Sequence, residues 1–505
     1  MITYWWLNEM RPISGILRLV LYGGLLVLCL IDSPSPLGAP KIIAGTEPLF
    51  YTPTGLVKLL GLRWVRPAVL TVLVRLTIAF WIAAALGFLQ PVTGIVTCLG
   101  FAFLHSVNAG ALGANHSTHS ALYALTALSF SVSYGFSVDG LLADHTAWPL
   151  LVSPGSVFES GFAPLLMLVF LSYTLFSGGV SKLRNGGLRW LDGRALRYYL
   201  EQSASLARWP WLSRQVVARP LLCRCMAVGA VLVELSAPLA IVSAPLRMPL
   251  IVVWVGLHVS ILLVMMPAYW IQMWCYLALV NWPWLIRAVG GSSAPATVFA
   301  TGGVGPVVFT AIGIAACLAL VMVLVRSSEE WPFTAVPMYS NGIPAAEIPL
   351  PAPGDLRARA LRARRGRYSS WERAWVADEV MEDIWLGDPG DPASRSLTTA
   401  MYLGDGPRLV RWSQYHKVVR DLAIADLAAR PADRTDFAAD DRDYPGTRFL
   451  GELARLARDV APEWANHDGL RLVCRTRDGW TVVARAGFGV EQLVGRSSDG
   501  WGDRV

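Results

Sequence analysis

Long uninterrupted apolar stretches fill the first two thirds of the chain, and a different pattern follows them. A stretch of about 20 apolar residues allows a helix to cross the hydrocarbon core of a membrane. Such stretches occupy residues 12–31, 68–89, 91–110, 119–138, 159–181, 221–244, 249–286 and 305–325. The stretch 249–286 exceeds one span, and Pro267 is expected to divide it. The pattern predicts about eight or nine membrane helices, the first uncleaved because no small-residue cleavage site follows it.

After Arg326 the periodicity becomes that of a water-exposed domain. Residues 450–465 carry apolar side chains at helical spacing. Residues 470–487 alternate in two runs joined by an Asp-Gly pair, which is typical of a β-hairpin. We therefore expect a mainly α protein, with a polytopic helical membrane domain over residues 1–326 and a small α+β soluble domain over residues 327–505.

The charges divide the chain at the same place. Residues 1–325 contain 18 Lys and Arg and 9 Asp and Glu, whereas residues 326–505 contain 25 and 27. This composition excludes a purely soluble enzyme and predicts a multi-pass protein whose first partner is the lipid bilayer. No stripe of cations is interleaved with exposed aromatic residues, so no nucleic-acid partner is expected. The use of 39 Arg against four Lys is typical of a GC-rich genome, and we expect a bacterial inner or cell membrane.

Two polar connections give opposing indications of topology. Residues 139–159 contain no Lys or Arg, whereas residues 182–224 contain Lys182 and eight arginines. The positive-inside rule places the second connection in the cytoplasm. Counting five spans from a cytoplasmic N-terminus places it outside, unless one apolar segment does not span.

Ionisable side chains inside apolar segments are costly and mark candidate functional sites. His116 and His119 are three positions apart and share one helical face. They fit a metal pair, a polar cavity that orients a substrate, or simple packing. Because no third ligand stands nearby, no metal site is predicted.

Lys182 and Glu234 are the other prominent members of this group. Lys182 ends an apolar run, where a lysine either extends its amine to the membrane boundary or, when partly buried, serves as a general base. Gly178 and Gly179, one turn earlier, permit close approach of another helix or of a flat ligand. Glu234 lies inside an apolar segment and needs a proton or a partner, for which Arg75, His116 and His258 are the candidates.

Several segments, taken in order, resemble the membrane domain of the vitamin K-dependent gamma-carboxylases, within the wider family of horizontally transferred transmembrane (HTTM) domains. The resemblance covers most of residues 10–290. It is carried by PISGILRLVLYG (12–23), ANHSTHSALY (114–123), YGFSVDGLLADH (134–145), YTLFSGGVSKLRNGGLRWLDG (173–193), VELSAPLAIV (233–242) and GLHVSILLV (256–264).

The resemblance implies chemical roles for these residues. In the family a lysine deprotonates the vitamin K hydroquinone, whose oxygenation yields a strong base that prepares a substrate glutamate for carboxylation. Lys182 matches that lysine, His116 matches an assisting histidine, His258 matches a membrane-helix histidine, and Glu234 matches an acidic position. The implied catalytic residues are therefore Lys182, His116 and His258. The implied binding site for reduced vitamin K or another quinol contains Gly178, Gly179, Glu234 and His119, and a peptide or protein would be the substrate.

The chain also departs from the family. Ser181 stands where the animal enzymes have a second lysine, and the C-terminal part is far shorter than their substrate-binding region. Two hypotheses follow. The protein is either a quinol-dependent carboxylase- or epoxidase-like membrane enzyme, or a non-catalytic scaffold or lipid and small-ligand binder whose C-terminal domain recruits a partner.

Overall fold

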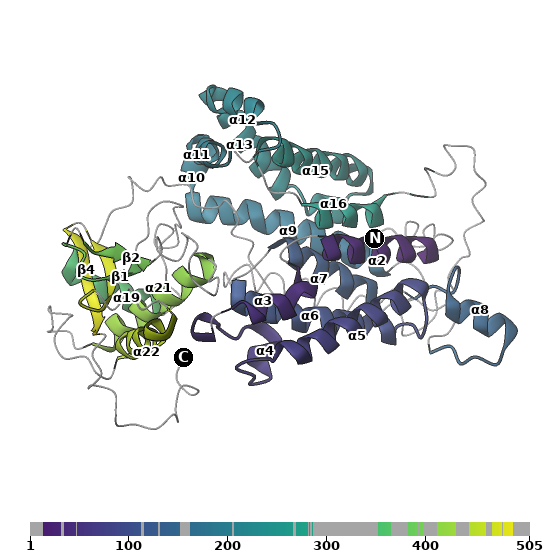
Figure 1. Ribbon diagram of the computed structural model, residues 1–505. Helices are drawn as coiled ribbons and strands as arrows, with labels where there is room; N and C mark the ends of the chain where they lie inside the picture. Colours follow the sequence, from purple (N-terminus) through teal and green to yellow (C-terminus); the bar gives the residue numbers. More distant parts are fainter. Residues whose placement is uncertain are drawn as a thin grey trace. The chain divides into compact units, whose positions relative to one another are not determined.

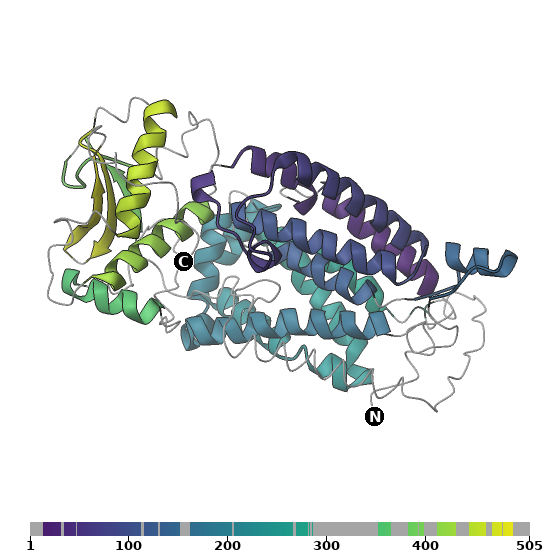
Figure 2. The same ribbon diagram turned by 90° about the horizontal axis from the view of Figure 1, so that it is seen from below.

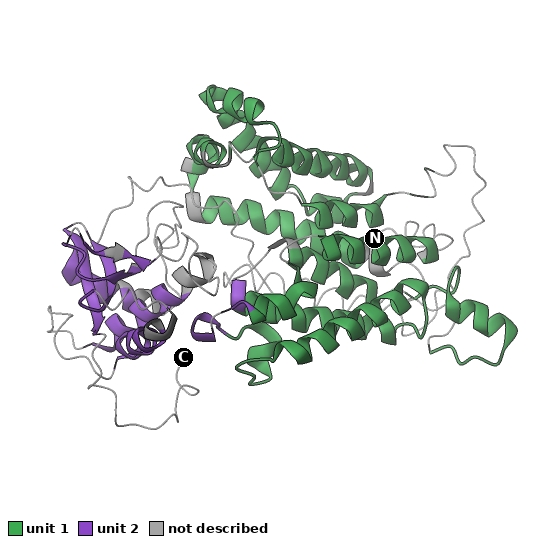
Figure 3. Ribbon diagram, in the orientation of Figure 1, with its two compact units in different colours: residues 1–44, 53–110, 114–344 green, residues 45–52, 111–113, 345–505 purple. Residues whose placement is uncertain are grey.

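The chain forms two compact units, each of which is described by itself (Figure 3). Unit 1 comprises residues 1–44, 53–110 and 114–344, and unit 2 comprises residues 45–52, 111–113 and 345–505. The computed structural model describes residues 14–285 apart from 32–34, 47, 113–115, 130–131, 152–161, 205–206, 266–268, 281 and 283–284, and then 352–364, 382–391, 393–397, 412–430, 444–460, 467–476 and 478–487. The expected domain boundary at residues 326 and 327 lies outside the described residues.

Unit 1 is helical and contains the candidate membrane spans. In the described part of the chain, four helices are long and apolar enough to cross a membrane. They are α5 (Pro67–Leu86), α6 (Val92–Leu112), α9 (Phe162–Gly186) and α15 (Ala244–Val264). The number rises to six if two bent pairs of helices each count as one span. One pair is α2 (Ser14–Ile31) with the short helices that follow it, and the other is α12 (Pro210–Val217) with α13 (Pro220–Leu235).

Shorter helices complete unit 1 (Figure 1). They are η2 (Pro36–Gly38), α3 (Ala39–Ala44), α4 (Gly55–Leu59), α7 (His116–Ser129), α8 (Val138–His145), α10 (Leu188–Leu191), α11 (Arg194–Ser203), α14 (Leu239–Val242), α16 (Trp270–Cys275) and η5 (Tyr276–Leu279). The expected span at 305–325 lies outside the described residues. The stretch 249–286 divides as expected, since α15 ends at Val264 and α16 begins at Trp270.

The expected span at 119–138 takes a different form. It is represented by α7, which has 14 residues and contacts α2, α9 and α16. All its described side chains except that of Thr126 are buried, as expected for a helix in the interior of a bundle. The helix does not continue through Ser133, because the amide of Ser133 donates to the Gln90 side chain and its carbonyl accepts from Arg18.

A buried arginine joins three parts of unit 1. Arg18 of α2 is 1% exposed, and its guanidinium donates to the carbonyls of Ala85, Ser133 and Phe136 and to Oε1 of Gln90, over 2.7–3.3 Å. Hydrogen bonds of this kind satisfy backbone groups that water cannot reach inside an apolar bundle. Arg18 therefore connects the first helix to the ends of two neighbouring segments.

Unit 2 contains a four-stranded antiparallel sheet in the order β2-β1-β3-β4. Its strands are β1 (Glu382–Leu386), β2 (Arg395–Ser396), β3 (Leu470–Thr476) and β4 (Gly479–Ala486). The expected hairpin is confirmed as β3 and β4, in which Thr476 pairs with Gly479. The central strand β1, which pairs with β3 through Ile384 and Leu472, was not expected from the sequence pattern.

Helices pack against the sheet and form the core of unit 2 (Figure 2). They are α19 (Leu356–Arg364), α21 (Trp412–Ala429) and α22 (Pro445–Val460), the last of which covers most of the helix expected at 450–465. Phe50, from the segment 45–52, contributes to this core through an edge-on contact with Phe449. The sheet and these helices form an α+β arrangement.

Candidate functional site

The candidate site lies where α9 meets α13. Both helices are apolar over most of their length, yet α9 carries Lys182 and α13 carries Glu234 at this contact. Both residues are buried, at 7% and 8% exposure. A charge in such a place needs a partner, because an unpaired ion in an apolar interior loses its hydration without replacement.

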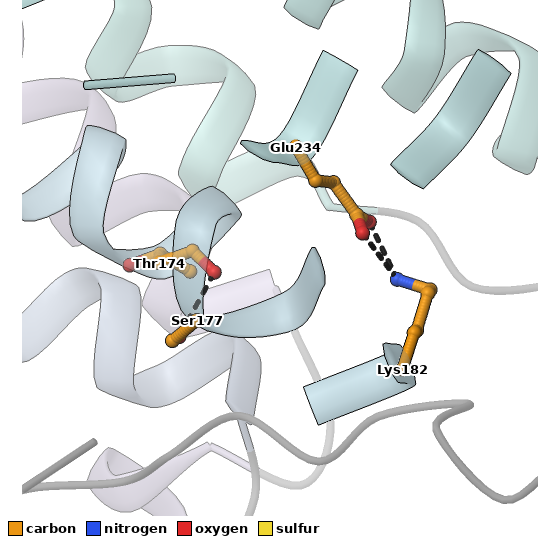
Figure 4. Close-up of polar contacts among 4 residues, drawn as sticks. All are labelled: Thr174, Ser177, Lys182 and Glu234. Carbon is orange, nitrogen blue, oxygen red and sulfur yellow. Dashed lines mark hydrogen bonds and ion pairs between the residues drawn. The ribbon is translucent and has the colours of Figure 1, made fainter. Parts of the chain in front are cut away.

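Lys182 and Glu234 supply that partner to each other (Figure 4). The Lys182 ammonium nitrogen lies 2.5 Å from Oε1 and 2.7 Å from Oε2 of Glu234. Trp190, on α10, presents its ring to the same ammonium at 5.3 Å from the ring centroid. The ammonium is thus stabilised by a carboxylate and by the negative face of an indole.

Glycines allow the two helices to come close enough for this pair. A Cβ atom at Gly179 would lie 3.0 Å from Cβ of Glu234 and 3.2 Å from side-chain atoms of Leu235. A Cβ atom at Gly178 would lie 3.7 Å from the Glu234 carboxyl group. The sequence analysis expected either another helix or a flat ligand beside these glycines. The structure places the helix α13 there, and small residues commonly allow membrane helices to pack this closely.

The pair can hold a proton in two arrangements. With the proton on Lys182, the two groups form an ion pair, and with the proton on Glu234 they form a neutral amine and a carboxylic acid. An amine in its neutral form can accept a proton from a weakly acidic hydroxyl group.

His258 belongs to a neighbouring aromatic cluster. Its Nδ1 lies 2.8 Å from the Trp254 carbonyl oxygen, which can only accept, so Nδ1 carries the hydrogen. Its ring meets those of Tyr269 and Tyr276 edge-on, at 5.2 and 5.7 Å between centroids. These contacts hold His258 among aromatic side chains of α15 and of the segment 269–276.

His119 takes part in a separate buried contact between α6 and α7. Its Nε2 lies 3.4 Å from Nε2 of His105, and the two rings meet edge-on. Thr118 lies 2.9 Å from Nδ1 of His105. His116 begins α7, but its side chain lies outside the described residues. Over the described residues, no group of three or more His, Cys, Asp or Glu is arranged to hold a metal ion.

The sequence analysis singled out Lys182 and Glu234 separately but did not pair them. Glu234 was expected to pair with Arg75, His116 or His258, whereas its carboxylate binds Lys182, and Arg75 is exposed on α5.

The sequence analysis did not single out Gln272 and Tyr276. They lie one helical turn apart, and Gln272 donates to the Tyr276 hydroxyl at 3.4 Å. The only indication of this contact in the sequence is the spacing of the two polar residues, four positions apart in an otherwise apolar and aromatic stretch.

Comparison of the chain with protein-family models, with curated proteins and with solved structures found no match. The site must therefore be interpreted from its own geometry.

Proposed function

We propose that the protein is an integral-membrane enzyme related to the HTTM and gamma-carboxylase type, in which Lys182 is the general base towards a quinol held within the bilayer. The observation that carries this proposal is the buried contact between Lys182 and both carboxylate oxygens of Glu234. Ion pairs are costly to bury, and ionisable groups inside membrane domains are concentrated at sites of proton transfer.

The roles of the residues follow from the arrangement of the pair. Transfer of the Lys182 proton to Glu234 leaves a neutral amine, which can then accept a hydroxyl proton from the quinol. The regenerated ammonium stabilises the negative charge that remains on the oxygen. Trp190 presents its polarisable indole face to the amine. A bound reduced vitamin K or other quinol would supply the remaining chemistry, since its oxidation by molecular oxygen would give the strong base needed for carboxylation and would convert the quinol to its epoxide.

Quinol-dependent oxygen uptake by the purified full-length protein tests this proposal. Lys182→Arg is the most informative variant, since a guanidinium retains the ion pair but cannot lose its proton. We expect Lys182→Arg to remain folded and to lose at least 100-fold in uptake, within the usual contribution of a general base. Lys58→Arg, at an exposed lysine of α4, is the matched control and should retain full uptake. Equal and robust uptake in the wild type and in Lys182→Arg would contradict the role of Lys182.

A second function is favoured by a specific observation. Glu234 and Leu235 already fill the space beside Gly179, and the carboxylate uses both oxygens on Lys182. These contacts are also those of a structural helix–helix pair in a non-catalytic scaffold or small-ligand binder, whose C-terminal domain would recruit a protein.

Lipid analysis separates the two functions. Mass spectrometry of the purified protein should find a stoichiometric quinone if the enzyme proposal holds. Loss of that quinone in Lys182→Met/Glu234→Leu, with retained folding, would place its binding at the pair. A folded wild-type protein with no bound quinone and no oxygen uptake would favour the scaffold.

A further inference from the structure

A group of exposed arginines lies beside and on α12 and in the first turns of α13. Its members are exposed and fall within 17 positions: Arg208, Arg214, Arg219 and Arg224. We call these four residues the arginine surface. The sequence contains no Asp or Glu from residue 202 to residue 233, so these cations have no acidic neighbour along the chain.

The nearest carboxylates upstream are already engaged. Asp192 binds Arg194 at 2.8 Å, and Glu201 binds Arg197 one turn away at 2.9 Å. Across the described residues, no ion pair or hydrogen bond involves a side chain of the arginine surface. Four exposed cations that form no ion pair with the residues the structure describes attract an anionic partner from outside.

Aromatic and aliphatic side chains accompany these arginines. Trp209 and Trp211 are 45% and 59% exposed and lie stacked, with ring centroids 6.4 Å apart. Leu221, at the start of α13, is 73% exposed. Exposed tryptophans beside cations are typical of the membrane–water boundary, where the indole remains at headgroup depth. An acidic protein partner would not require this apolar component.

Contacts with α15 fix the position of the arginine surface along the candidate membrane helices. The Trp209 amide donates to the carbonyl of Leu263, which is next to the last residue of the apolar span α15. Val216 packs with Val264 and Met265 at the same end. Figure 1 shows α11 and α12 gathered at one end of α13 and α15. The arginine surface therefore lies at the end of the candidate span α15 and at the start of α13.

The bend between α12 and α13 gives the surface its orientation. The two helices form an angle of 102°. If α13 follows the membrane normal, α12 lies nearly parallel to the membrane plane. An amphipathic helix in this position rests in the interfacial layer, with its cations near the phosphates.

We propose that the arginine surface, together with Trp209 and Trp211, binds the headgroups of anionic phospholipids. This inference is independent of the proposed catalytic function, since it involves neither Lys182 nor Glu234. Each cation near such a surface contributes to lipid affinity. Because the surface carries only positive charges, we expect it to bind an anionic glycerophospholipid more tightly than a zwitterionic one.

Thermal unfolding of the full-length protein in a neutral detergent tests the proposal, with phosphatidylglycerol or phosphatidylcholine added. A ligand that binds only the folded protein raises its melting temperature. We expect phosphatidylglycerol to raise it and phosphatidylcholine to have little effect. Arg214→Gln/Arg219→Gln should lose at least half of that rise, while Arg455→Gln/Arg485→Gln, at exposed positions in unit 2, should retain it. If the first variant does not fold, Arg208→Gln/Arg224→Gln replaces it.

Three outcomes would overturn the proposal. One is a wild-type protein that responds equally to both lipids or to neither. Another is an arginine variant that folds and keeps the full response to phosphatidylglycerol. The third is an equal response to polyglutamate, which would indicate that a soluble acidic partner, and not a lipid surface, occupies the site.

Discussion

The ammonium of Lys182 and the carboxylate of Glu234, 52 positions apart in the sequence, form a buried ion pair between α9 and α13. The pair leaves neither charge unpaired in an apolar interior. Replacing one or both residues should therefore show how much each contributes to the free energy of unfolding.

Removing one member of the pair should destabilise the protein far more than removing both. Glu234→Leu leaves Lys182 without its carboxylate, and breaking a buried pair typically costs about 3–5 kcal/mol. Lys182→Met/Glu234→Leu replaces both charges with apolar side chains and should recover most of the loss. Melting temperatures in detergent for the single variants and the double variant measure this coupling. Additive effects of the two single changes would show that the residues do not interact.

The glycine that permits the approach of α13 should not accept a large side chain. Gly179→Leu would place carbon atoms where those of Glu234 and Leu235 already lie. We expect a loss of about 1–3 kcal/mol, as found for overpacked interiors. Gly229→Leu is the matched control, because a Cβ at this position of α13 meets nothing within 4 Å. Equal melting temperatures for the two variants would contradict the close contact.

Arg18 should be among the most sensitive residues of unit 1. Arg18→Leu removes a donor to three carbonyls and to Gln90. Buried acceptors left without partners cost about 1–3 kcal/mol each when water cannot reach them. Arg75→Leu, at an exposed arginine of α5, should leave the melting temperature nearly unchanged. A folded Arg18→Leu protein as stable as Arg75→Leu would exclude this role for the guanidinium.

In unit 2, the start of α22 depends on the absence of a side chain at Gly446. The Gly446 amide donates to Oδ1 of buried Asp426 at 2.7 Å, and a Cβ at Gly446 would lie 2.7 Å from Oδ2. Gly446→Ala should therefore weaken the contact between α21 and α22 and lower the free energy of unfolding by about 1–3 kcal/mol. Gly354→Ala meets nothing within 4 Å and serves as the control. Hydrogen exchange of the α22 amides would locate the change, and protection equal to that of the control would contradict it.

The elements with strong local patterns could be predicted from the sequence. The spans at 68–89 and 91–110 correspond closely to α5 and α6, and the Asp-Gly pair corresponds to the turn between β3 and β4. These elements could be predicted because a long apolar helix and a tight hairpin are specified by residues that are close together in the sequence.

Elements that depend on distant contacts could not be predicted in this way. The span expected at 119–138 became the shorter helix α7, because Arg18 and Gln90 bind the backbone at Ser133. The strand β1 has little pattern of its own and is held by its pairing with β3. Neither contact leaves a periodic signal in the sequence.

The sequence by itself determined that this protein has an apolar helical part and a charged part, and that Lys182 and Glu234 are exceptional within the former. Only the tertiary structure decided that these two residues bind each other, that Gly179 brings their helices together, and that four arginines near the end of α15 form no ion pair with the described residues. The physical reason is that an isolated charge in an apolar segment indicates the need for a partner. The identity of that partner depends on helix packing, which residues distant in the chain decide together.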